Sequence, residues 1–305
     1  MTNFLKNLAT WKYQRIPKPD TLDDGFVLIA VIWVCGLLAI IATAFTATVT
    51  SQIYATRNVT ELASLESAAS GMANLVAFQL ASAQSEHNAN GKWQTCTWNE
   101  RTEIVFRIQD QGGLIDLNTA SPFLVLALLQ GLAGNQLGAP KILAAIEDFR
   151  DPDQQSVDAA GEQPLYEDKS YGPKNAPFVS PFELDQIPEI PDDLFLELQE
   201  FTTIHSQAPG IDLSLAPQRL LAVLSKGKAA GFDLTQFNQP SAARIFAVEA
   251  VAMGKAGGIF HRRMLVNILG QPEKPFAILE WRRARSEPLD TTLLQSIGPC
   301  IIAKS

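Results

Sequence analysis

The chain has 305 residues, of which 47% are hydrophobic and 18% charged, and its formal net charge is −8 at pH 7. That length is ample for a globular core of one or two domains. The acidic balance argues against a nucleic-acid-binding protein, because nucleic-acid phosphates repel a chain of the same sign.

A short polar leader precedes an uncharged, apolar segment. Residues 1–25 hold four basic and three acidic side chains, and Asp23 and Asp24 stand directly before Gly25. The 20 residues from 26 to 45 are nearly all apolar, and no charged residue occurs from 26 to 56. A helix of about 20 apolar residues spans a bilayer, whereas the apolar core of a secretory signal is shorter. We therefore expect a membrane-spanning helix with a cytoplasmic leader.

The apolar segment continues into an amphipathic one without a break. Residues 46–84 contain no proline and a single glycine. Apolar residues recur there close to the 3.6-residue period of a helix, at Leu62, Leu65, Ala69, Met72, Leu75, Val76 and Leu80. The pattern predicts one long helix over residues 26–85, embedded in a membrane at its start and amphipathic at its end.

Strand patterns stand on both sides of a helical block. Residues 87–98 read as a polar break and residues 103–108 as a strand, while residues 243–252, 257–268 and 276–283 are further strand candidates. Residues 141–149, 180–190 and 191–201 read as helices. We expect one sheet packed on the long helix, with a mainly helical region inserted between its strands.

The helical block contains an internal near-repeat. Residues 115–128 recur as residues 211–224, 96 positions later, with Ile, Asp, Leu, Ala, Leu and Leu at corresponding places. Each copy predicts an extended lead, a cap and a short amphipathic helix.

The Gly25–Phe26 junction, the apolar segment and its amphipathic continuation resemble the N-terminus of type IV pilin-like proteins. The resemblance implies that a prepilin peptidase cuts between Gly25 and Phe26 and that Phe26 is then methylated. Most members have Glu at the fifth mature position, where this chain has Ala30. In its missing Glu and its downstream repeat, the chain resembles the large minor pseudopilin of type II secretion, the general secretion pathway protein K family.

That resemblance implies an α+β fold, with a pilin-like long helix packed on an antiparallel sheet and a large SAM-like or helix-hairpin-helix domain inserted between strands. It divides the chain into a leader (1–25), the long helix (26–85), a β domain (86–118 and 239–305) and the inserted domain (119–238). It also implies a location in the inner membrane with the bulk of the chain in the periplasm of a Gram-negative bacterium.

The implied function is structural. A protein K-like subunit caps the tip of the periplasmic pseudopilus with other minor pseudopilins and helps to start its assembly for export across the outer membrane. Its partners are the I- and J-type minor pseudopilins, the major pseudopilin, prepilin peptidase and inner-membrane lipid, with no nucleic acid. The family's Glu is thought to pair with a neighbour's buried N-terminal ammonium. A subunit at the tip has no neighbour above it whose ammonium must be neutralised, and Ala30 in place of Glu agrees with that position. The alternative is a single-pass anchored periplasmic binding protein that is not processed as a pilin.

An acidic segment predicts a cation site. Residues 147–168 hold eight carboxylates and one base, Arg150. Asp151, Asp153 and Glu162 have the spacing of positions 1, 3 and 12 of an EF-hand, but Ser156 replaces its glycine, so the segment is not an EF-hand. The resemblance implies calcium in the helical domain. Spacing selects the ligands Asp151, Asp153, Asp158 and Glu162; the alternative is a solvated acidic loop.

Cys96 and Cys300 both follow the apolar segment, in the part expected to be exported, where they could form a disulfide or stay as two thiols.

DNA binding and catalysis have weak signals. Residues 131–134 offer a glycine turn that could bind DNA phosphates, but the segments that flank the turn are acidic. The three histidines are far apart in sequence, and no nucleophile elbow or phosphate loop occurs. We therefore expect that the protein is not an enzyme and that His261 is a surface or core residue and not a metal ligand.

Overall fold

The computed structural model describes residues 23–82, 88–133, 138–152, 166, 170–227, 233–284 and 295–300. The chain forms two compact units, residues 1–60 and residues 61–305, and each is described by itself. Helix α1 (Asp23–Ser82) belongs to both, since its first part lies in one unit and its last part in the other. The predicted long helix is confirmed up to the last described residue before the gap at 83–87.

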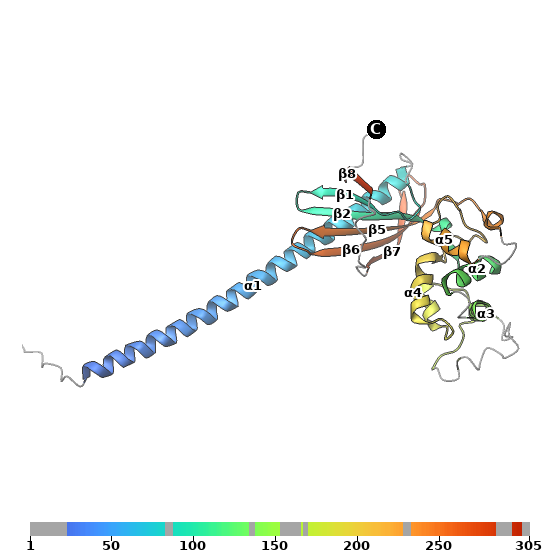
Figure 1. The fold of residues 1–305 in the computed structure, drawn as a ribbon. Helices are drawn as coiled ribbons and strands as arrows, with labels where there is room; N and C mark the ends of the chain where they lie inside the picture. Colours follow the sequence, from blue (N-terminus) through green and yellow to red (C-terminus); the bar gives the residue numbers. More distant parts are fainter. Residues whose placement is uncertain are drawn as a thin grey trace, which may run out of the picture. The chain divides into compact units, whose positions relative to one another are not determined.

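A six-stranded sheet forms the centre of the second unit. Its strands are β1 (Gln94–Asn99), β2 (Thr102–Asp110), β5 (Ile245–Gly254), β6 (Ile259–Ile268), β7 (Phe276–Arg283) and β8 (Gln295–Pro299), in the order β7-β6-β5-β2-β1-β8 (Figure 1). Neighbours are antiparallel except β1 and β8, which are parallel. The predicted strands in 103–108, 243–252, 257–268 and 276–283 are confirmed.

Two strands of this sheet were not predicted. All of strand β1 except Asn99 lies in the stretch 87–98 that reads as a polar break, so that interpretation is wrong for the second half of the stretch. The sequence of this strand, Gln-Thr-Cys-Thr-Trp-Asn, has only weak apolar alternation. The strand forms through its pairing with β2 on one side and β8 on the other, and such pairing leaves no clear pattern in the sequence. Strand β8 likewise owes its place to pairing with β1, a contact between residues about 200 positions apart.

One face of the sheet packs on the last part of α1. The helix contributes side chains spaced by three or four residues, and the strands contribute alternate residues, as their periods require. This first core contains Leu65, Ala69, Met72 and Val76 of α1 together with Ile104, Phe106, Val248, Ala250, Met264 and Val266 of the sheet. The predicted helix face is confirmed at these four positions, whereas Leu62 is 38% exposed.

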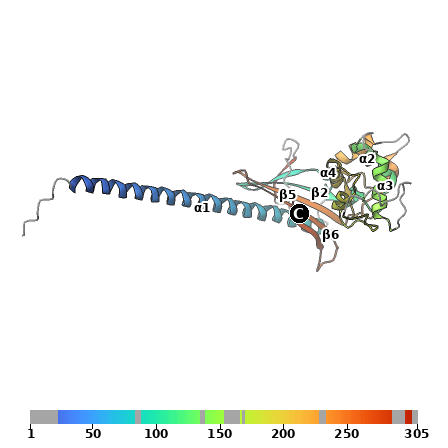
Figure 2. The ribbon, with the colours of Figure 1, turned by 90° about the horizontal axis from the view of Figure 1, so that it is seen from below.

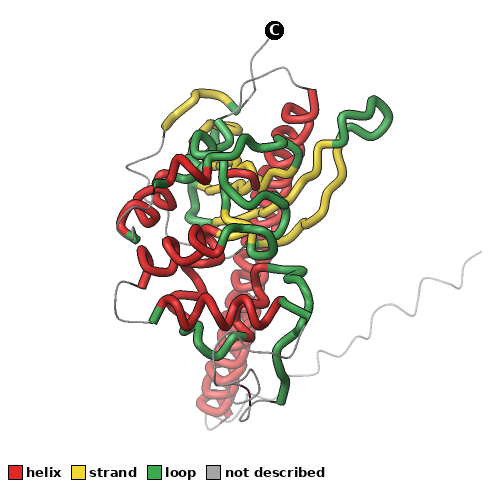
Figure 3. Tube along the Cα trace, turned by 90° about the vertical axis from the view of Figure 1, so that its right-hand side faces the viewer, coloured by secondary structure: helices red, strands yellow, loops and turns green. Residues whose placement is uncertain are grey.

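A mainly helical region leaves the sheet after β2 and returns to it at β5. Its helices are α2 (Pro122–Ala133), α3 (Ala139–Arg150), α4 (Asp192–Phe201) and α5 (Gln218–Lys226), with short 3-10 turns η1 (Gln111–Gly113), η4 (Pro181–Gln186) and η5 (Leu234–Phe237). In Figure 2 the labelled helices α2, α3 and α4 lie together beyond one end of strands β2, β5 and β6. Figure 3 distinguishes the helices, in red, from the strands, in yellow, and both kinds occur, as in an α+β fold. A two-stranded parallel sheet, β3 (Ile115–Asp116) with β4 (Thr202–Thr203), lies within the region.

The predicted helices at 141–149 and 191–201 are confirmed as α3 and α4. The helix predicted at 180–190 is instead the short 3-10 turn η4, which ends at Gln186. Ile187 precedes Pro188, and a residue before proline is disfavoured in helical geometry. The helical pattern therefore stops after two turns.

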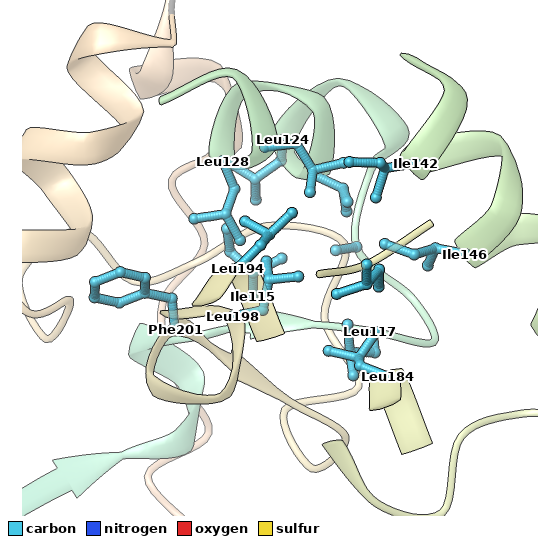
Figure 4. Packing of buried hydrophobic residues seen from close by; sticks show 14 of the residues in the cluster. Ile115, Leu117, Leu124, Leu128, Ile142, Ile146, Leu184, Leu194, Leu198 and Phe201 are labelled. Carbon is cyan, nitrogen blue, oxygen red and sulfur yellow. The ribbon is translucent and has the colours of Figure 1, made fainter. Parts of the chain in front are cut away.

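The helical region has a core of its own. Leu124 and Leu128 from α2 meet Ile142 and Ile146 from α3, with Leu194, Leu198 and Phe201 from α4 on the other side (Figure 4). Ile115 and Leu117 enter the same core from the first repeat. The region therefore stabilises itself by burying apolar surface and does not depend only on the sheet.

The sequence repeat is also a structural repeat. Asp116 Oδ1 accepts the backbone N–H of Asn118 at 2.9 Å, and Asp212 Oδ1 accepts that of Ser214 at 3.0 Å. The two equivalent turns lead into α2 and α5, which begin 96 residues apart at Pro122 and Gln218. Both copies of the repeated Asp therefore organise the turn before a helix, as side-chain acceptors do at such positions.

Candidate functional sites

The first part of α1 exposes a continuous apolar surface. Phe26–Ser82 is the one helix among the described residues that is long and apolar enough to cross a membrane. In its most apolar window none of the surface is buried within the protein, and Phe26 and Trp33 are 73% and 76% exposed. Such a surface needs lipid or other apolar helices to cover it.

Threonine hydroxyls in this helix are satisfied internally. Thr43, Thr46 and Thr50 each donate to a backbone carbonyl one turn earlier, at distances of 2.8–3.0 Å. An unsatisfied hydroxyl in hydrocarbon would cost several kcal/mol, so this bonding lets polar residues remain in an apolar environment. The pattern suits a segment that resides in a membrane.

The predicted processing junction lies at the start of the same helix. Gly25 and Phe26 fall within α1, and Ala30 follows just over one turn later with an exposed side chain. The side chain at the fifth position after the junction is therefore an apolar methyl group on the helix surface. No carboxylate occurs between this position and the first charged residue, Arg57.

A buried carboxylate occupies the sheet face opposite α1. Glu249 of β5 is 5% exposed and lies across from Arg107 of β2 in the strand register. Arg107 Nη2 donates to both Glu249 oxygens at 3.2 Å, and Arg263 Nη1 donates to Oε1 at 2.5 Å. His261 Nε2 lies 3.2 Å from Oε2. Four charge-bearing side chains from three neighbouring strands thus form one cluster, which we call the Glu249 cluster.

The electrostatic balance of the Glu249 cluster favours an ionised carboxylate. Burial acts to raise the pKa of Glu249, but Arg107, His261 and Arg263 lower it by more, and the net pKa lies well below its ordinary value of 4.5. A charge buried in this way is tolerated because it is paired and hydrogen-bonded. The cluster therefore has the character of a structural ion-pair network.

The Glu249 cluster continues to the helical region. Arg107 Nη1 lies 4.0 Å from Glu200 Oε1 of α4, and Glu200 also pairs with Arg219 of α5. A cavity of about 50 Å³ lies here, lined by residues that include Gln109, Thr202, Glu249 and Arg263. Its size suits one or two waters and not an organic substrate. The cluster thus ties the sheet to the helices.

The sequence did not lead us to predict the Glu249 cluster, and we expected only a surface or core position for His261. The structure buries His261 at 7% exposure beside Glu249, which agrees with the core alternative. One signal was available: Glu249 stands in the middle of an otherwise apolar strand. Which of these charges meet depends on strand order and register, and neither is written in the sequence.

Two carboxylates join the segment that leaves the sheet after β2 to the segment that returns to it at β5. Ser241 Oγ donates to Asp110 Oδ1 at 2.7 Å, and the Ser241 backbone N–H donates to Asp212 Oδ2 at 2.9 Å. Burial raises the pKa of Asp110, while bonds from Ser241 and Gly112 act against that rise. The residue where β2 ends is thereby joined to the segment that leads back to β5.

Of the predicted calcium ligands, only Asp151 lies in the described part. It follows α3, and its backbone N–H donates to the Glu147 carbonyl. Burial raises the pKa of Glu147, and the neighbouring Asp148 and Asp151 charges add to the rise against Arg150. Asp153, Asp158 and Glu162 lie outside the described residues. Among those described, no group of three metal-binding side chains converges.

Two of the three cysteines are joined to each other. Cys96 of β1 and Cys300 after β8 form a disulfide with a Cα–Cα distance of 4.9 Å, and both are buried. Their approach follows from the pairing of β1 with β8. Cys35 is free and exposed on α1.

The glycine turn weighed for DNA binding has a different neighbour. A Cβ on Gly131 would lie 2.1 Å from the carbonyl oxygen of Val223 in α5. The glycine thus permits close packing of α2 on α5. Gly134 lies outside the described residues.

Comparison with known proteins points to one system. Residues 109–207 match the family model of protein K of the type II secretion system (T2SS). A chain of the GspK–GspI–GspJ complex from the enterotoxigenic Escherichia coli Type 2 Secretion System has a similar fold. The TM-score is 0.53 at 15% identity, over 78% of this chain and 99% of that one. At that identity the likeness concerns the fold, and it confirms a pilin-like α+β fold. No curated protein sequence matches the chain.

Proposed function

Over residues 109–207 the chain is a member of the type II secretion system protein K family, and from this premise we propose that the whole chain is a minor pseudopilin of that system. It caps the tip of the periplasmic pseudopilus and helps to start its assembly. Its role is structural: it supplies a shaped subunit and performs no chemical step.

One observation carries the proposal: the family match falls on the region inserted between two strands of a pilin-like sheet. The matched segment begins at Gln109, at the end of β2, and runs through α4. An exposed apolar helix precedes the sheet in the same chain. The combination supports a subunit that passes from a membrane into a filament, since its apolar helix needs a cover in both places.

The proposed location is the inner membrane, with the bulk of the chain in the periplasm. The proposed partners are I- and J-type minor pseudopilins, the major pseudopilin and prepilin peptidase. The chain of similar fold belongs to a GspK–GspI–GspJ complex, and this supports the first two partners. We place the domain limits at 25/26, 85/86, 118/119 and 238/239, as the sequence predicts.

The competing function is an anchored periplasmic binding protein that keeps its leader. The exposed apolar helix fits that function too, because a single-pass anchor also needs one. The two differ at the bond between Gly25 and Phe26.

N-terminal sequencing separates the two functions. The full chain is purified from cells with and without prepilin peptidase. A pseudopilin begins at a methylated Phe26 only in cells with the enzyme; an intact Met1 in both strains contradicts processing. A Gly25→Val variant serves as the uncut reference, with Gly36→Val as its control, since a Cβ on Gly36 meets no atom within 4 Å.

Calcium remains part of the proposal. Asp151 would supply oxygen ligands together with Asp153, Asp158 and Glu162. Carboxylates gather at the C-terminal end of α3, where the helix dipole is unfavourable to negative charge, and a cation would relieve the repulsion. A chelator should lower the melting temperature of the chain and Ca²⁺ should restore it. Unchanged melting together with no metal by elemental analysis contradicts this site.

A further inference from the structure

Strand β7 forms one edge of the six-stranded sheet. The strand order begins at β7, and its partner among the described residues is β6 (Figure 1). The outer side of β7 therefore presents backbone N–H and C=O groups that another strand could pair with. At the opposite edge, β8 is only five residues long and ends in Pro299, a residue that cannot donate to a ladder.

The β7 edge carries large apolar side chains that are not buried. Ile278, Leu279 and Trp281 are 46%, 49% and 39% exposed. Ile278 lies opposite Val266 and Trp281 opposite Met264, and both partners belong to the core under α1. The apolar face of the sheet thus continues past the protein's own helix to the β7 edge, where Arg262 lies 4.8 Å over the Trp281 ring. Natural edges are usually protected by charges or prolines; in β7 the residues before Glu280 are all apolar, and this stretch indicates an interaction surface.

The charge at the end of β7 selects the kind of partner. Arg282 pairs with Glu280, whereas Arg283 lies 5.1 Å over the ring of Phe260. No carboxylate of the described residues lies within ion-pair distance of Arg283. With two arginines and one glutamate, β7 is positive on a chain whose net charge is −8. A second copy would bring another positive edge, so an acidic partner is the better complement.

We propose that β7 docks an extended segment of an I- or J-type pseudopilin, which adds a strand to the sheet. The segment presents apolar side chains to Ile278 and Trp281, and a carboxylate to Arg283. Main-chain hydrogen bonds supply affinity, and the alternating side chains supply specificity. The inference rests on the proposed function, because it takes its occupant from the filament.

A photo-crosslinking experiment tests the surface directly. The full chain is co-expressed with the I- and J-type pseudopilins of the same bacterium and purified in detergent. A photoreactive phenylalanine replaces Leu279 in one variant and Leu196 in another. Leu196 lies on α4 and is 61% exposed, so it serves as an exposed control away from the edge. Crosslinks to an I- or J-type subunit are expected at position 279 and not at position 196.

Charge reversal provides a second readout. Arg283→Glu should lower the amount of co-purified partner by about fivefold, the effect of losing an interaction worth roughly 1 kcal/mol. Arg101→Glu, at an exposed turn between β1 and β2, should leave it unchanged.

The outcomes separate this inference from the function. Co-purification that survives Arg283→Glu, with no crosslink at position 279, overturns the β7 surface and leaves the pseudopilin function standing. A crosslink at position 279 to a second copy of the chain also overturns it. Failure of the wild-type chain to co-purify with either subunit overturns both.

Discussion

Gly227 packs directly against Ala127: a Cβ on Gly227 would lie 1.9 Å from the carbonyl oxygen of Ala127. The reciprocal pair, 96 residues apart at both positions, is Gly131 against the carbonyl of Val223. Residues 127 and 223, and residues 131 and 227, are equivalent places in the sequence repeat. The two repeat helices therefore meet through a pair of matched glycine contacts, and each glycine is needed because backbone occupies the space of its side chain.

Gly227→Ala should destabilise the helical region, because the new methyl group forces α2 and α5 apart. We expect a loss of about 2–4 kcal/mol in the free energy of unfolding, in the range of overpacked and strained core positions. Thermal or urea unfolding of the purified chain measures it. Gly172→Ala is the matched control, since a Cβ there meets no atom within 4 Å and should change stability by less than about 0.5 kcal/mol. Equal stability of the two variants would contradict the packing role.

Glu249→Gln should cost more than a typical surface substitution. The change leaves Arg107 and Arg263 facing a neutral amide in a buried place. Breaking a buried pair from one side costs about 3–5 kcal/mol. Glu197→Gln is the control: it removes an exposed pair with Arg219, worth about 1 kcal/mol or less. Urea unfolding at neutral pH compares the two variants, and similar losses would show that the Glu249 cluster is not a buried network.

The contribution of Glu249 to the free energy of unfolding should depend on pH. The pKa of Glu249 is lower in the folded chain than its ordinary value of 4.5, so the unfolded chain binds this proton more readily. Its contribution to stability is therefore present above about 4.5 and is lost as the pH falls below that value. The difference between wild type and Glu249→Gln should be greatest near neutral pH and should shrink on acidification. A difference that grows as the pH falls would reverse the sign and refute the assignment.

The Cys96–Cys300 bond closes a loop with a sequence separation of 204 residues. Its removal by Cys96→Ser with Cys300→Ser should lower stability by about 2–5 kcal/mol. Thiol titration of the denatured, unreduced chain should find one free thiol, that of Cys35. Three thiols in protein exported to the periplasm would contradict the pairing, and Cys35→Ser should leave stability unchanged.

Ala30→Glu tests the tip position. A carboxylate in a bilayer costs about 3 kcal/mol unless a partner neutralises it, and a subunit at the tip has no subunit above it. Secretion should therefore fall severalfold in a complementation assay. Ala30→Gln, of nearly the same size but uncharged, should be affected much less. Full secretion with Ala30→Glu would contradict the tip position while leaving the family assignment intact.

Periodicity alone determined much of this protein. The apolar run from Phe26, the 3.6-residue spacing through Leu65 and Met72, and the apolar, Val-, Ile- and Phe-containing stretches of β5 and β6 are local properties, and a helix or strand responds to its own residues first. The repeat of Asp116 and Asp212 was legible for the same reason, because each carboxylate binds backbone only two residues away.

Tertiary structure decided the rest. Strand β8 is held by its pairing with β1, about 200 residues away in the chain, and the Glu249 cluster exists because β2, β5 and β6 lie side by side in one register. Strand order also left β7 at an edge of the sheet. A sequence fixes which faces are apolar or charged, but which faces meet depends on contacts between residues far apart along the chain.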